Sequence, residues 1–229
     1  MSAIRAVLFD VDFTLVKPGP DLGPEGYRRM GRRFGLELVP ERYHDARLAA
    51  IGELERHPEL DHDEAVWIAF TERIVRGMGG DADTAHDCAV EMTRAWEHAH
   101  NFDLFDDALP VLETLRRHGL MLGLVSNTGR DLEAFVRHHG LDVDCALSSK
   151  AHGKTKPHPT IFAAALERLG VRPRDAAMIG DSVEDDVEGA AAVGMRALLV
   201  DREDRYPERP DRLRDLLGVP AALGLPPLA

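Results

Sequence analysis

The stretch Ala6-Val7-Leu8-Phe9-Asp10-Val11-Asp12-Phe13-Thr14 places two aspartates directly after a short apolar run. The run is rich in strand formers and predicts a buried β-strand. In an open α/β sheet, the residues just beyond the carboxyl end of a strand lie in the ligand crevice. Asp10 and Asp12 share a small volume there, so they need a cation or a shared proton to coexist. A D-x-D pair that stood alone would indicate only a polar turn, so the rest of the chain decides between these interpretations.

Four further apolar runs read as strands, each bounded by Gly, Pro or Asp, at residues 120–125, 143–147, 176–179 and 197–200. Helical patterns with apolar spacings of three or four residues lie between them. A glycine closes each helical pattern at a position suited to a C-cap, namely Gly119, Gly140, Gly170 and Gly194. This alternation predicts βαβ units and a parallel sheet. The expected fold class is α/β, with a Rossmann-like three-layer core formed by residues 1–16 and 106–229.

Residues 17–105 interrupt the alternation and contain no convincing strand pattern. Apolar residues recur there at helical spacing in four groups: Tyr27, Met30 and Phe34; Leu48, Ile51 and Leu54; Trp67, Phe70, Ile74 and Met78; and Ala85, Cys88, Met92 and Trp96. Both joints to the core are turn-rich or irregular and are expected to act as hinges. The sequence therefore predicts an inserted four-helix cap over residues 17–105.

Composition and charge limit the partners of the chain. Its 229 residues carry a formal net charge of −12 with a pI near 5.3, which opposes binding to nucleic acid or to an anionic membrane. A phosphorylated substrate would need local positive charge. The two cysteines, Cys88 and Cys145, lie in apolar surroundings and are expected to be free buried thiols. With no apolar run long enough for a membrane span and no signal-like start, we expect a cytoplasmic protein.

Three more polar constellations follow the other core strands. Ser126-Asn127-Thr128-Gly129 offers a hydroxyl, an amide and backbone N–H groups suited to phosphoryl oxygens. Lys156 stands directly before a proline that is expected to start a helix. Gly180-Asp181 opens an acidic cluster that ends at Asp186. Each constellation alone could be an ordinary helix cap or a solvated loop. Four such clusters at strand ends are hard to attribute to capping.

Taken in order, these motifs resemble those of the haloacid dehalogenase-like hydrolase superfamily, in the subfamily with a helical cap between its first two motifs. Asp10, Asp12 and Thr14 match the D-x-D-x-T signature, and Ser126-Asn127 matches the second motif. Lys156 matches the third motif, and residues 180–186 match the G-D-x-x-x-x-D form of the fourth. The match covers nearly the whole chain. Phe13 departs from the small or polar residue usual at its position and is expected to shape the substrate side of the site.

The resemblance implies a mechanism for Asp10 and Asp12. Asp10 would attack phosphorus to form an aspartyl-phosphate, which splits one difficult displacement into two easier ones. Asp12 would protonate the leaving oxygen and then activate water. Mg²⁺ would be held by Asp10, by the backbone carbonyl of Asp12 and by Asp181, with water and substrate completing an oxygen shell.

The resemblance also implies the groups that handle the phosphate charge. Lys156, Ser126 and Asn127 would bind the phosphoryl oxygens, because phosphoryl transfer depends mainly on positioning and electrostatics. Supporting residues would be Thr14, Asp185 and Asp186. Which of Asp185 and Asp186 is the second carboxylate of the fourth motif stays open at this point.

Several activities are compatible with this fold. Asp12 argues against a dehalogenase, because a halide leaving group needs no general acid. A Schiff-base hydrolase of the same superfamily would need a lysine in the cap, and none lies among the expected cap helices. We therefore expect a Mg²⁺-dependent phosphatase acting on a small phosphorylated metabolite, as a monomer or homodimer. A sugar phosphomutase is the closest alternative, and a non-catalytic binding protein is the more distant one.

Overall fold

The computed structural model describes residues 4–54, 59–209 and 212–226. The chain divides into two compact units. One unit consists of Met1–Lys17 together with Leu104–Ala229, and the other is Pro18–Asp103.

The first unit is built on a five-stranded sheet with the order β5-β4-β1-β6-β7. All neighbouring strands are parallel, and the central strand β1 pairs on both sides, with Ala6 opposite Met121 and Ala176. The strands are β1 (Ala6–Phe9), β4 (Met121–Ser126), β5 (Cys145–Ser148), β6 (Ala176–Gly180) and β7 (Arg196–Leu199). Each of the five predicted strands is present, displaced by two residues at most, so the predicted α/β fold class is confirmed.

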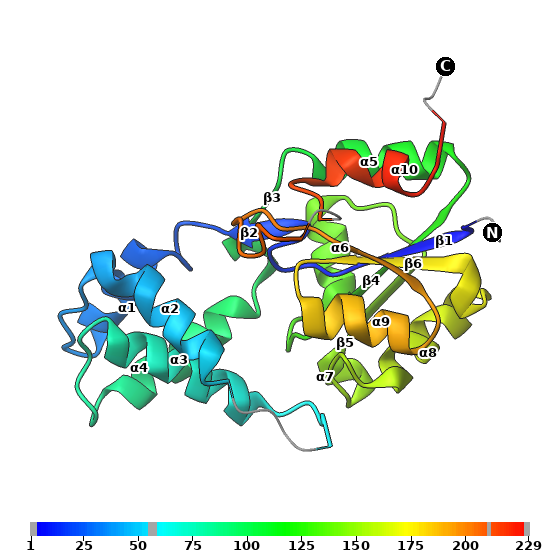
Figure 1. The fold of residues 1–229 in the computed structure, drawn as a ribbon. Helices are drawn as coiled ribbons and strands as arrows, with labels where there is room; N and C mark the ends of the chain where they lie inside the picture. Colours follow the sequence, from blue (N-terminus) through cyan, green and yellow to red (C-terminus); the bar gives the residue numbers. More distant parts are fainter. Residues whose placement is uncertain (1–3, 55–58, 210–211, 227–229) are drawn as a thin grey trace. The chain divides into compact units, whose positions relative to one another are not determined.

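Helices cover both faces of this sheet, which gives the predicted three layers. Figure 1 shows α8 (Pro159–Leu169) and α9 (Gly189–Ala192) on one side, with α5 (Ala108–Arg117) and α10 (Val219–Ala222) on the other. Ala6 and Leu8 of β1 belong to the core cluster that includes residues of α8. Their neighbours Val7 and Phe9 are equally buried, because a strand alternates its side chains between two covered faces. Two more helices, α6 (Leu132–His139) and α7 (Ser149–His152), contact β5.

Two of the four predicted glycine caps of the first unit are confirmed, whereas Gly119 and Gly194 lie one residue beyond the C-caps of α5 and α9. Gly140 and Gly170 cap α6 and α8 in the left-handed conformation, with φ of 64° and 63°. This conformation is strained for residues with a Cβ and free of strain for glycine. The periodic apolar patterns therefore end where the chain can turn into the next strand.

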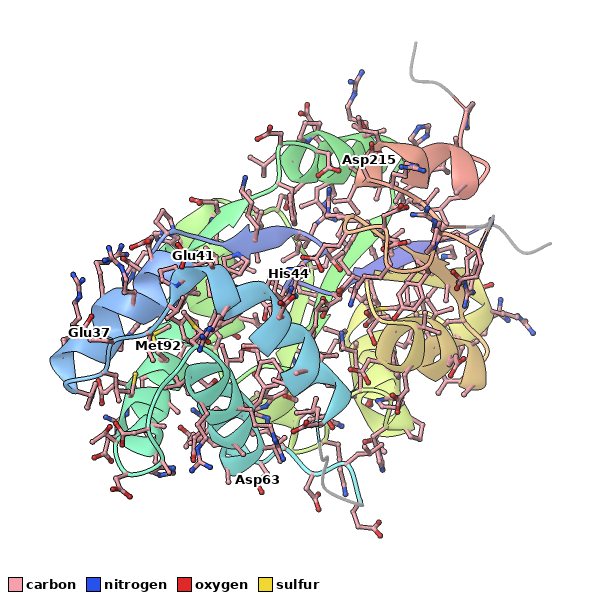
Figure 2. All side chains as sticks on the ribbon, turned by 60° about the vertical axis from the view of Figure 1, so that its left-hand side comes forward. Glu37, Glu41, His44, Asp63, Met92 and Asp215 are labelled. Atoms are coloured by element: carbon pink, nitrogen blue, oxygen red, sulfur yellow. The ribbon has the colours of Figure 1, made fainter. Side chains whose placement is uncertain are left out.

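The second unit consists mainly of four helices, as predicted. They are α1 (Pro24–Arg33), α2 (Tyr43–Gly52), α3 (Glu64–Gly77) and α4 (Ala85–Trp96). Figure 2 labels Met92, which is buried among these helices, and Glu37 and Asp63, which are exposed. The apolar group expected to be the buried stripe of α2 is not buried, since Leu48 and Ile51 are 43% and 40% exposed. Small side chains and one arginine form its buried face: Ala46, Arg47 and Ala50.

The joints between the two units differ from the irregular segments that we expected. They form the short strands β2 (Val16–Pro18) and β3 (Phe102–Leu104), which pair as a two-stranded sheet. Strands of three residues are too short to show an alternating pattern, so the sequence does not reveal them. Within the described residues, no helix has the length and apolar character needed to cross a membrane.

Candidate active site

The polar residues predicted for the site gather at the carboxyl edge of the parallel sheet. Asp10 follows β1, Ser126 ends β4, and Asp181 follows β6. The register between β1 and β6 continues one step further, because the Asp10 amide donates to the Ile179 carbonyl at 2.9 Å. Lys156 reaches the same edge from the loop before α8. Four separate parts of the chain therefore contribute to one site.

Lys156 is the positive centre of the site. Its Nζ lies 2.6 Å from Oδ1 of Asp10 and 2.7 Å from Oδ1 of Asp186, and its side chain is almost fully buried. Burial alone would lower the pKa of Lys156, but the two carboxylates raise it well above its usual range. The ammonium is therefore a fixed positive charge beside Asp10.

Three carboxylates can converge on one point. Ligand oxygens of Asp10, Asp181 and Asp186 lie within 4.8 Å of one another. Burial raises the pKa of Asp181, and repulsion from Asp10 adds to that rise. Burial likewise raises the pKa of Asp186, because together with repulsion from Asp10 and Asp181 it outweighs the Lys156 ammonium. These three carboxylates carry more negative charge than Lys156 neutralises, and they offer only oxygen atoms as ligands. Hard divalent cations such as Mg²⁺ prefer such ligands, so the residues fit this metal.

The acidic cluster after β6 separates the roles of Asp185 and Asp186. Asp186 bonds Lys156 through Oδ1 and accepts from the Ser182 amide through Oδ2 at 3.0 Å. A Cβ at Gly180 would overlap the Asp186 carboxylate, so the carboxylate can approach only because this residue is glycine. Residues 183–188 form a π-helical turn, a rare geometry that is frequent at functional sites. Asp185 instead accepts from Nδ2 of Asn127 at 3.2 Å.

Asn127 lies at the site, and its side-chain amide bonds the backbone of Lys156. Its Oδ1 accepts from the backbone amide of Lys156 at 2.7 Å, and its Nδ2 donates to the Lys156 carbonyl at 3.0 Å. The side-chain amide therefore fastens the Lys156 loop to the end of β4. This leaves positioning of Lys156 as the role that the geometry supports for the Asn127 side chain.

Thr14 and Ser126 are both buried at the site. The Thr14 hydroxyl lies 3.4 Å from Oδ2 of Asp10 and 3.5 Å from Oδ1 of Asp181, which are long hydrogen bonds. Ser126 is the last residue of β4 and pairs in register with Ser148 of β5. Thr14 therefore links the two aspartates predicted to bind metal.

Asp12 faces a partner that the sequence reading missed. Nη2 of Arg130 lies 2.9 Å from Oδ1 and 3.2 Å from Oδ2 of Asp12. Burial raises the pKa of the Asp12 carboxyl, although the Arg130 guanidinium opposes this rise. The sequence places Arg130 directly after Ser126-Asn127-Thr128-Gly129, near the same edge of the sheet, but it does not show that the side chain bonds Asp12.

A second arginine that we missed contacts Asp181. Nη2 of Arg205 donates to the Asp181 carbonyl at 2.8 Å and to its Oδ2 at 2.7 Å. Arg205 belongs to the segment that follows β7. Asp201 anchors this loop by accepting from the backbone amides of Arg205 and Tyr206.

Comparison with known proteins agrees with this fold and site. The family model for haloacid dehalogenase-like hydrolases matches residues 4–194. The chain is 31% identical over 240 residues to a phosphoserine phosphatase from Thermus thermophilus, and the match covers 93% of this chain and 94% of that protein. The chain therefore belongs to the haloacid dehalogenase-like hydrolases and is an enzyme of that class.

Solved structures of the same family carry different activities. A phosphatase from Thermococcus onnurineus superposes with a TM-score of 0.66 at 29% identity, covering 96% of this chain and 98% of that one. A 2-haloacid dehalogenase from Pseudomonas syringae superposes with a TM-score of 0.61 at 28% identity, with the same coverage. The two structures are nearly equal in TM-score and sequence identity to this chain, so structural similarity does not decide between their reactions. The residues of the site have to decide.

Proposed function

We propose that this chain is a Mg²⁺-dependent phosphatase that hydrolyses small phosphomonoesters through an aspartyl-phosphate on Asp10. The observation that carries the proposal is the Asp10 carboxylate, which lies 2.6 Å from the Lys156 ammonium and beside Asp181 and Asp186. When Asp10 acts as the nucleophile, the Lys156 ammonium beside it can bind the oxygens of the incoming phosphate. Asp12, two residues further on, supplies the acid that an alcohol leaving group requires.

The proposed reaction has two steps. A carboxylate oxygen of Asp10 attacks phosphorus, the bond from phosphorus to the ester oxygen breaks, and Asp12 gives its proton to the departing alcohol. Water then attacks the phosphorus of the aspartyl-phosphate, Asp12 takes the proton from that water, and phosphate leaves with Asp10 restored. Lys156 balances the negative charge of the phosphoryl oxygens in both steps.

Mg²⁺ would be held by Asp10, by Asp181 and by the backbone carbonyl of Asp12. When bound, it would neutralise charge on the substrate phosphate so that two anions can meet. Asp186 would hold Lys156 in place, and Asn127 would fasten the backbone on either side of that lysine. Ser126 and backbone N–H groups after β4 would bind phosphoryl oxygens.

Purified protein should release phosphate from a panel that holds phosphoserine, sugar phosphates, nucleotides and 4-nitrophenyl phosphate. Phosphoserine belongs in the panel because it is the substrate named for the Thermus relative. We expect turnover with Mg²⁺, none with chelator, and loss of at least about 10³-fold in Asp10→Asn, because the amide is no nucleophile.

The control is the Asp10→Asn protein purified in parallel, since it carries any contaminating phosphatase. Equal activity in both preparations would refute the proposed nucleophile. If the folded wild-type protein released phosphate from no substrate of the panel, the proposed phosphatase activity would be refuted. The next assay would then be sugar-phosphate isomerisation.

A further inference from the structure

Arg130 and Asp12 form an ion pair in which the arginine is almost fully buried, unlike the arginine of an ordinary surface ion pair. The Arg130 side chain is 1% exposed, whereas that of Asp12 is 22% exposed. Burying a guanidinium is unfavourable unless it is paired, and an apolar residue would often be as stable at such a position. The Asp12 carboxyl therefore keeps some access to solvent, whereas its arginine partner has almost none.

Arg130 is itself held by its neighbours. Its guanidinium lies 5.2 Å from the centre of the Phe135 ring, and its backbone amide donates to the Thr128 hydroxyl at 3.2 Å. The next residue, Asp131, caps α6 by accepting from the amides of Glu133 and Ala134. The start of α6 and the end of β4 thus define where the guanidinium lies.

We propose that Arg130 is a positioning residue that orients the Asp12 carboxyl for proton transfer to the leaving oxygen. One nitrogen of Arg130 lies within 3.2 Å of both Asp12 oxygens, which restricts rotation of the carboxyl group. The pair becomes stronger once Asp12 has given up its proton, so it favours the arrangement that forms as the alcohol departs. Arg130 keeps all of its own protons throughout. The inference rests on the phosphatase proposed above.

Two substrates of similar shape test this role. Phenyl phosphate needs protonation of its leaving oxygen, whereas 4-nitrophenyl phosphate has a leaving group that departs without much help. In Arg130→Gln, we expect kcat/KM to fall about 10-fold or more for phenyl phosphate and under about 3-fold for 4-nitrophenyl phosphate. The parameter kcat/KM is chosen because it reports the steps up to departure of the alcohol. Equal losses on the two substrates would overturn the inference.

The matched control is Arg116→Gln, which removes an arginine from a carboxylate pair elsewhere in the same unit. Arg116 bonds Asp142 and Asp144 and should leave both rates unchanged. When Asp12→Asn is already present, adding Arg130→Gln should lower kcat/KM by less than about 2-fold on either substrate, because no acid is left to orient. A loss as large as in the wild-type background would also overturn the inference.

Thermal unfolding shows whether each variant folds. If Arg130→Gln does not, Arg130→Lys keeps the charge but not the planar group, and the loss should again be larger for phenyl phosphate. Absence of wild-type activity would instead count against the proposed function. An active wild-type enzyme with no difference between the two substrates in the variant would count against Arg130 alone.

Discussion

The side-chain amide of Asn127 illustrates what a sequence motif determines at the level of one residue. The motif placed an amide at the end of β4, and the structure has it there. The sequence could not tell that the amide would bond the Lys156 backbone, because proximity of strand ends does not fix the direction of a side chain. The identity of the neighbours was predictable, and the pattern of donors and acceptors was not.

Phe13 has a backbone conformation that few bulky residues adopt. Its φ is 63°, and its amide donates to the Val16 carbonyl at 2.7 Å in the turn that follows Asp12. In this conformation a residue with a Cβ destabilises the folded state by roughly 1–2 kcal/mol, whereas glycine is almost unstrained. Glycine lowers stability by about 0.4–1 kcal/mol for a different reason, because it gives the unfolded chain more conformational freedom. We therefore expect Phe13→Gly to be more stable than Phe13→Ala by about 0.5–1 kcal/mol.

Urea denaturation of the two Phe13 variants measures this difference directly. Both variants lack the ring, so any difference between them reports the backbone and not the lost contacts. An alanine variant that is as stable as the glycine variant would show that the turn relaxes to accept a Cβ.

Among the elements, the loop after β7 brings two arginines to the site that no motif in the sequence had marked. Arg202 bonds Thr14, and Arg205 bonds Asp181. Arg202 donates to the Thr14 carbonyl and pairs with Asp107, with its guanidinium 3.8 Å from the centre of the Phe105 ring. Charge patterns along a chain cannot reveal such pairs, because each partner comes from a distant segment.

Loss of this contact should destabilise the unit that contains the sheet. Arg202→Ala removes the partner of Asp107. Both side chains of this pair are largely buried, since Arg202 is 14% exposed and Asp107 is 10% exposed. We expect the free energy of unfolding to fall by about 2–4 kcal/mol, in the range typical when one partner of a buried pair is removed. Chemical denaturation followed by circular dichroism measures the change.

Arg94→Ala is the control for that measurement. Arg94 pairs with Glu91 on the exposed face of α4, and its removal should change the free energy of unfolding by no more than about 0.5 kcal/mol. Similar effects of the two substitutions would contradict a structural role for the loop.

Helix α2 shows a different limit of sequence reading. Its helical state was predicted correctly, but the residues chosen as its buried face were not. Large apolar side chains usually mark the buried stripe, whereas the buried residues of α2 are Ala46, Arg47 and Ala50. A period of three to four residues identifies a helix, and only the neighbouring helix decides which face is covered.

For the molecule as a whole, the candidate metal site couples to stability. Asp10, Asp181 and Asp186 repel one another, and a bound cation would remove that repulsion in the folded state only. At a Mg²⁺ concentration 100 times the Kd, the stabilisation is about 2.7 kcal/mol. For a chain of this size, this corresponds to a rise in Tm of about 5–10 °C.

Differential scanning calorimetry with Mg²⁺ and with chelator measures this rise without any assay of activity. Asp181→Asn should show a much smaller shift, and sodium chloride at the same ionic strength should show none. A rise that is equal in the wild type and in Asp181→Asn would place the cation elsewhere.

The order of strands and helices was largely predictable because each element repeats a short physical rule. Short apolar runs, apolar spacings of three to four residues, glycine at helix ends and polar residues at strand ends all indicated the same α/β fold. The site residues Asp10, Lys156 and Asp181 followed from that order. Arg130 and Arg205 did not, because a buried ion pair depends on distances between segments that no local pattern contains.

The first strand of the chain is the middle strand of its sheet. Ala6 of β1 has its partners at Met121 and Ala176, so a ribosome makes the whole helical unit before β1 gains a neighbour. Pairing between such remote segments folds slowly, because the chain must close long loops first. A nascent chain of this protein therefore carries an unpaired apolar strand until β4 has been made. Its active site is completed only when Arg205 has emerged.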